Sequence, residues 1–106
     1  PPMTASEKDG LRLSVEKCWN VNVGSQAANV IVTVSISMNP DGSVISNSLS
    51  LKESQGGSED AVHAAFQAAR RAILRCQGKS YDLPEEKYDY WREIEFTFDP
   101  KKMRIK

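Results

Sequence analysis

This chain of 106 residues contains few of the residues that build catalytic, metal-binding or membrane-spanning structures. His63 is its only histidine, and with two cysteines it falls short of a four-ligand zinc site or a disulfide-rich scaffold. No apolar run approaches the roughly 20 residues that span a bilayer. Lysine plus arginine number 14 and aspartate plus glutamate number 14, so no basic excess favours nucleic-acid binding. We therefore expect a single domain with no cofactor and no metal site.

The two cysteines, Cys18 and Cys76, stand at the ends of the two segments with a clear helical pattern. One cysteine per helix end, far apart in sequence, favours a disulfide that clamps the two helices. Such a bond would stabilise the fold by about 4 kcal/mol in the chain-entropy model, and it would place the domain outside the reducing cytosol. Two free buried thiols remain the alternative.

A first amphipathic helix is predicted near the start of the chain. Leu11, Val15 and Trp19 follow one another at a spacing of four and form one apolar face. Residues 4–7 have the pattern of a capping box, but Gly10 weakens the first turns by about 1 kcal/mol. We therefore expect the helix to begin just before that glycine.

A second helix is predicted after Ser58, a good N-cap that acidic residues follow. Its apolar stripe advances by three or four residues through Val62, Phe66, Ala69, Ile73 and Cys76. His63 lies off this stripe, which favours a solvated histidine over a general base. Three arginines near the helix end suit the helix dipole better than a nucleic-acid contact; they are Arg70, Arg71 and Arg75.

Three strands are predicted by alternating apolar residues. The first covers residues 30–38, a turn follows at residues 39–42, and the second strand returns over residues 43–52 to form a hairpin. The third strand has Ile94, Phe96 and Phe98 on one face. The first strand has the most regular apolar face, so we expect it in the middle of the sheet with the other two at the edges.

The order helix, strand, strand, helix, strand predicts an α+β fold. Its sheet would be three-stranded, antiparallel or mixed, with a hairpin plus a crossover strand and both helices packed on one face. We expect the domain to occupy residues 9–100. Residues 1–8 would be the end of a linker or a boundary, with any targeting or anchoring segment upstream, and residues 101–106 a frayed tail.

No catalytic constellation is found, so we do not expect an enzyme. Glu85 and Glu86 are adjacent, and neighbours in a helical turn point apart, which favours a helix start over paired carboxylates. Gly56 and Gly57 precede a helix and could cradle an anion. The acidic residues that follow them would repel one, so a loop is the better interpretation.

The third strand leaves a pairing edge to be explained. Charge and flanking aromatic residues could protect this edge, or a partner could add a strand to it through backbone hydrogen bonds. The candidate partner-binding residues are Arg92, Glu93, Ile94, Glu95, Phe96 and Thr97. Composition alone does not separate the two interpretations.

An ordered set of segments resembles the C-terminal domain of TolA, in its alphaproteobacterial form. They are Val-Glu-Lys-Cys-Trp-Asn at 15–20, Asn-Pro-Asp-Gly-Ser-Val at 39–44, Ala-Ile-Leu-Arg-Cys at 72–76, Tyr-Asp-Leu-Pro at 81–84 and, after a tryptophan at 91, Phe-Thr-Phe-Asp-Pro at 96–100. The resemblance spans nearly the whole chain. The C-terminal domain of TonB shares this architecture, and the paired cysteines favour TolA.

This resemblance implies a periplasmic domain at the end of a stalk that is anchored in the inner membrane, where TolQ and TolR would act on it. The family links that membrane to TolB and the lipoprotein Pal, which keeps the outer membrane invaginated during division. Colicins and filamentous phage coat proteins exploit the same domain, and family partners add a strand to the sheet. The alternatives are a TonB-type energy transducer that docks on outer-membrane transporters, and a small ligand-binding domain or enzyme.

Overall fold

The fold is α+β, as predicted. The computed structural model describes residues 4–19, 29–78 and 81–100, so the predicted tail at 101–106 lies outside the described residues. Its elements are α1 (Ala5–Glu16), β1 (Ile31–Ser37), η2 (Ser46–Ser48), β2 (Ser50–Gln55), α2 (Glu59–Cys76), η3 (Glu85–Lys87), α3 (Tyr88–Trp91) and β3 (Glu93–Phe98). No helix in the described part of the chain has the length and apolar character to cross a membrane.

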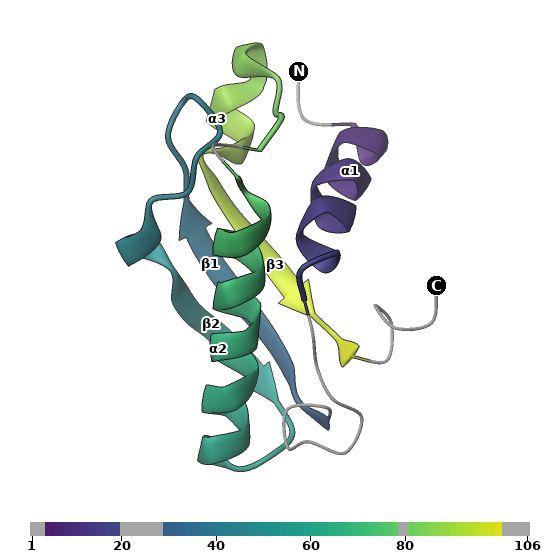
Figure 1. Ribbon diagram of the computed structural model, residues 1–106, viewed down its shortest axis with the longest axis vertical. Helices are drawn as coiled ribbons and strands as arrows, with labels where there is room; N and C mark the ends of the chain where they lie inside the picture. Colours follow the sequence, from purple (N-terminus) through teal and green to yellow (C-terminus); the bar gives the residue numbers. More distant parts are fainter. Residues whose placement is uncertain (1–3, 20–28, 79–80, 101–106) are drawn as a thin grey trace.

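The sheet has the order β2-β1-β3, which confirms the prediction that the first strand is central. Both neighbours run antiparallel to β1. Val32, Val34 and Ile36 of β1 are buried on one face of the sheet, in the same core as Leu11 of α1 and Ile73 of α2. Both helices therefore cover this face, with α2 across the sheet and α1 beside it on the side of β3 (Figure 1).

The second strand is shorter and begins later than residues 43–52, so the predicted bounds were wrong. After an isolated bridge between Met38 and Val44, the chain forms the 3-10 turn η2 before β2 starts at Ser50. The Ser48 hydroxyl donates to the Ile45 carbonyl at 2.6 Å and accepts from the Ser37 N–H at 2.9 Å. The Ser48 side chain thus takes the place of a backbone acceptor for the Ser37 N–H. Alternation of apolar residues does not reveal such a competition between side chain and backbone.

Helix α1 begins at Ala5, four residues before the predicted start of the domain at residue 9. Thr4 and Glu7 form the reciprocal capping box, with the Glu7 N–H donating to the Thr4 hydroxyl at 3.2 Å. The capping box satisfies two backbone donors at the helix start, which offsets the weak helix propensity of Gly10. The prediction that this helix begins just before Gly10 was therefore wrong.

Helix α2 begins after Ser58, whose side chain accepts from the Ala61 N–H, as predicted. The buried face differs from the predicted stripe, because Val62 and Phe66 are only partly buried. The residues that face the core most fully are alanines apart from one isoleucine, and they are Ala61, Ala65, Ala68, Ala69, Ala72 and Ile73. Alanine adds little bulk, so the helix axis can approach the sheet closely.

Candidate functional site: the free edge of β3

Strand β3 leaves one side of its backbone without a neighbouring strand among the described residues, because it is last in the sheet order. The Met38 N–H donates to the Arg92 carbonyl at 2.8 Å, and the register continues through Ile36 opposite Ile94 and Val34 opposite Phe96. Hydrogen-bonded and non-hydrogen-bonded pairs alternate in an antiparallel ladder. The residues between these pairs therefore turn their N–H and C=O groups away from β1, and they are Glu93, Glu95 and Thr97.

The same three residues point their side chains to the face of the sheet on which no helix of the described residues packs, since side-chain direction also alternates along a strand. All three are exposed. Thr97 makes a cross-strand contact with Thr33, with 3.1 Å between the hydroxyl oxygens. Glu95 lies 3.8 Å from the ammonium group of Lys52, and these two side chains are 53% and 61% exposed, so this ion pair contributes little.

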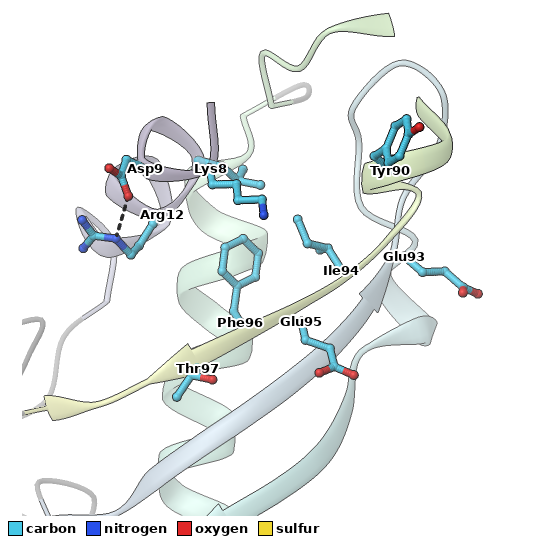
Figure 2. A pocket seen from close by; sticks show the side chains of 10 residues that line it. Lys8, Asp9, Arg12, Tyr90, Glu93, Ile94, Glu95, Phe96 and Thr97 are labelled. Carbon is cyan, nitrogen blue, oxygen red and sulfur yellow. Dashed lines mark ion pairs between the residues drawn. The ribbon is translucent and has the colours of Figure 1, made fainter. Parts of the chain in front are cut away.

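A groove of about 590 Å³ runs along this edge, between β3 and the first turns of α1. Figure 2 shows Ile94 and Phe96 pointing into the groove, on the opposite side of the strand from Glu93 and Glu95. Lys8, Asp9, Leu11 and Arg12 of α1 form the facing wall, and Tyr90 of α3 also lines the groove. The apolar floor and the unpaired backbone thus lie next to each other.

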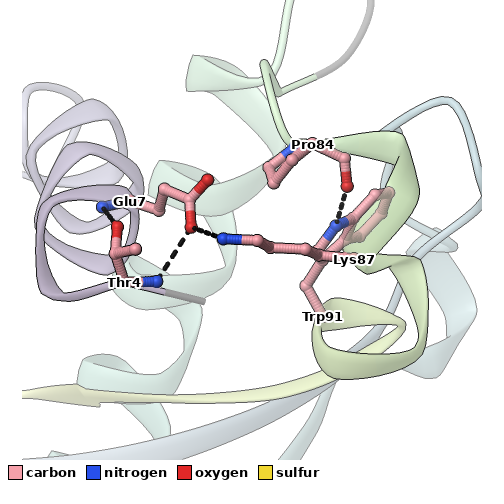
Figure 3. A network of polar contacts seen from close by, with 5 residues as sticks. All are labelled: Thr4, Glu7, Pro84, Lys87 and Trp91. Atoms are coloured by element: carbon pink, nitrogen blue, oxygen red, sulfur yellow. Dashed lines mark hydrogen bonds and ion pairs between the residues drawn. The ribbon is translucent and has the colours of Figure 1, made fainter. Parts of the chain in front are cut away.

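The wall of the groove is tied to the segment that leads into β3. The Lys87 ammonium donates to a Glu7 carboxylate oxygen at 2.8 Å, and the Thr4 N–H donates to the same oxygen at 2.8 Å (Figure 3). The hydrogen bond from Lys87 and that from Thr4 lower the pKa of Glu7. Behind Lys87, the buried Trp91 donates its indole N–H to the Pro84 carbonyl at 2.8 Å. This network fixes the start of α1 relative to β3.

The far end of α1 is held by the cysteines. Cys18 follows α1 by two residues, Cys76 is the last residue of α2, and their sulfur atoms are bonded with the Cα atoms 5.7 Å apart. Trp19 then packs against Phe98, with 5.4 Å between the ring centroids. The disulfide pairing that the sequence favours is therefore the one in the structure, and it holds the groove wall against the second helix.

The structure places five of the six candidate edge residues, Glu93 to Thr97, along the groove. Arg92 lies outside both the groove lining and β3, because it caps α3 and donates its backbone N–H to the Tyr88 carbonyl. Sequence reasoning missed the residues that α1 contributes, above all Lys8 and Arg12. Their helical pattern was visible, but the position of that helix against β3 depends on tertiary packing.

The other edge of the sheet, which β2 forms, is less regular than the edge of β3. β2 has a register shift between Thr33 and Val34 of β1, and all its residues are exposed. A hollow of about 540 Å³ lies beside it against α2, and the exposed His63 is at its rim. Among the described residues, no group of three histidine, cysteine, aspartate or glutamate side chains is arranged to hold a metal ion.

Comparison with known protein families, with curated proteins and with solved structures finds no match to this chain. The site is therefore interpreted from its own geometry and from the resemblance described above.

Proposed function

We propose that this chain is a non-enzymatic interaction module of the TolA type, which binds an extended segment of a partner by adding it as a fourth strand to the edge of β3. The partners would be TolB and Pal in the periplasm, and colicins and filamentous phage coat protein would bind the same edge. The domain would sit at the end of a stalk anchored in the inner membrane and driven by TolQ and TolR.

The observation that carries this proposal is the regular edge of β3, with which no other strand of the described residues pairs, beside a groove with an apolar floor. Strand addition needs both parts, because backbone hydrogen bonds supply affinity and side-chain pockets supply selectivity. The outward N–H and C=O groups of Glu93, Glu95 and Thr97 can form the backbone hydrogen bonds. Ile94 and Phe96 line the groove that can receive the side chains of the partner.

The disulfide suits a domain that transmits force. A pull on the N-terminal side of the domain acts on α1, which is joined to α2 by the bond between Cys18 and Cys76. Peeling of the region that follows α1 away from α2 would require breaking a covalent bond rather than only apolar contacts. The groove wall lies on the N-terminal side of Cys18, so under load it would depend on the contact between Glu7 and Lys87 rather than on the disulfide.

The test is the affinity of an N-terminal TolB peptide for Glu95→Pro, measured by isothermal titration calorimetry. Proline removes the outward Glu95 donor while leaving the ladder to β1 intact. Ser54→Pro is the matched control, because Ser54 lies between the hydrogen-bonding positions of β2 and also turns its N–H away from β1. We expect at least a tenfold loss of affinity for Glu95→Pro and none for Ser54→Pro.

Unchanged affinity in a Glu95→Pro variant that keeps the wild-type circular dichroism spectrum would rule out this edge. Tight binding of a plug-segment peptide from an outer-membrane transporter, without binding of the TolB peptide, would instead support the TonB-type alternative.

A further inference from the structure

A segment that pairs with β3 would place its side chains alternately on two unlike faces. Side chains opposite Ile94 and Phe96 would enter the groove beneath α1, whereas those opposite Glu93 and Glu95 would lie on the face without helices. The chemistry of the two faces therefore sets which residues the segment carries at alternate positions.

The groove face favours apolar side chains and disfavours cations. Its floor is made by Ile94 and Phe96, and Leu11 adds an apolar side chain to the facing wall. Figure 2 shows the Lys8 ammonium above this floor, and no carboxylate of the described residues lies within ion-pair distance of it. A lysine or arginine of the incoming segment would meet Lys8 there at close range and would be repelled.

The open face has the opposite preference. Glu93 and Glu95 follow each other at a spacing of two on the same side of the strand, and both are exposed. Their charge is only weakly compensated, since the nearest cation to Glu95 is the exposed Lys52 at 3.8 Å. Opposite charges directly across two paired strands attract, and like charges repel.

We infer that the β3 edge selects an extended segment in which apolar residues alternate with lysine or arginine, the apolar set entering the groove beneath α1 and the basic set facing Glu93 and Glu95. This inference rests on the proposed strand addition. The same charges also fix the register, because a slip by one residue exchanges the two faces. A slipped segment would place its cations against Lys8 and its apolar side chains against the two glutamates.

The probes are two capped seven-residue peptides, one alternating valine with lysine and the other alternating valine with glutamate. Their affinities for the 106-residue chain are measured by following its backbone amide signals in a two-dimensional NMR titration. We expect the lysine peptide to bind about tenfold more tightly, with the largest shifts at Glu93, Glu95 and Thr97, because two cross-strand pairs change from repulsive to attractive.

A charge-reversal variant distinguishes this charge selectivity from nonspecific peptide binding. In a variant with Glu93→Lys and Glu95→Lys the preference should invert, and the glutamate peptide should become the tighter ligand. Glu53→Lys is the matched control, because Glu53 lies on the same open face at the other edge of the sheet. It should leave the ratio of the two affinities within about twofold of the wild-type value, since its distance from the site exceeds a cross-strand contact.

The outcomes distinguish the inference from the function on which it rests. Equal affinity of the two peptides, with both lost in Glu95→Pro, would overturn the charge selectivity and leave strand addition standing. Tighter binding of the glutamate peptide would overturn the selectivity as well. Failure of both peptides and of the TolB peptide to shift the β3 amides would overturn both proposals.

Discussion

Strands β2 and β3 form the two opposite edges of one sheet, and these edges differ in the regularity of their backbone. β2 is interrupted by a register shift, all its residues are exposed, and Lys52 stands in the interruption. β3 pairs with β1 without a shift along its whole length and has Phe96 and Phe98 buried beneath it. Bulges and lysines are devices that stop an edge from recruiting another strand. Only β3 retains the regular form of a template.

The two edges also differ in what holds them. β3 follows α3, whose Trp91 is fully buried, and it faces a helix that is attached at one end by an ion pair and at the other by a disulfide. β2 follows a 3-10 turn and contributes no buried side chain. A strand that accepts a partner must stay in place when that partner is pulled, and the anchoring of β3 meets this need.

The largest expected difference between the edges is in stability. Phe98 is fully buried, so Phe98→Ala should lower the free energy of unfolding by about 3–5 kcal/mol. Leu51 of β2 is 40% exposed, and Leu51→Ala should cost less than about 1 kcal/mol. Urea denaturation followed by circular dichroism measures both values. Losses that agree within about 1 kcal/mol would remove this distinction between the strands.

Reduction of the disulfide should have the next largest effect on stability, and it should also affect the β3 edge. Reduction should lower the free energy of unfolding by about 2–4 kcal/mol, because the unfolded chain regains the freedom that the closed loop removes. It should also weaken peptide binding at β3, since α1 forms the groove wall. Denaturation curves and peptide titrations with and without reductant measure the two effects.

A double variant with Cys18→Ala and Cys76→Ala serves as the control for reduction, because reductant should leave it unchanged. Free thiols at both cysteines in the mass spectrum of the non-reduced protein would contradict the clamp, although the fold itself would stand.

The smallest expected effect concerns the ion pair that positions α1. Lys87→Met should raise the pKa of Glu7 towards its ordinary value of 4.5, because the hydrogen bond from Lys87 is the main cause of the lowering. Since folding lowers this pKa, the stabilisation is present above the unfolded value and is lost as the pH falls below about 4.5. Carbon-detected NMR titration of the Glu7 carboxyl measures the shift.

Lys52→Met is the matched control at the other edge. It removes the 61%-exposed ammonium group near Glu95, and it should leave the Glu7 titration unchanged. A Glu7 pKa that is the same in the wild type and in Lys87→Met would show that this pair does not hold the groove wall in solution.

Much of the sheet followed from local patterns, because alternation reports directly which side chains are buried. β1 and β3 lie where their apolar residues predict, and the central place of β1 followed from its long apolar face. The start of β2 did not, since the Ser48 side chain accepts the Ser37 N–H in place of a backbone carbonyl. The buried face of α2 was also displaced, because alanine carries a weak hydrophobic signal but allows the closest packing.

The candidate site was predictable in part. The pairing edge at Glu93 to Thr97 follows from the strand pattern together with the expected strand order. The groove does not, because Lys8 and Leu11 reach β3 only through the packing of a helix that is distant in sequence. The contact between Glu7 and Lys87, for example, joins residues 80 positions apart. Patterns within one segment carry no information about such a contact.

The measurement that tests the central claim most directly is amide hydrogen exchange of the free chain and of the chain saturated with an N-terminal TolB peptide. The account predicts that Glu93, Glu95 and Thr97 exchange quickly in the free chain and become protected with the peptide, whereas Ile94 and Phe96 are protected in both. Protection that appears at the β2 amide of Ser54, or at no amide of β3, would contradict the assignment of this edge as the binding site.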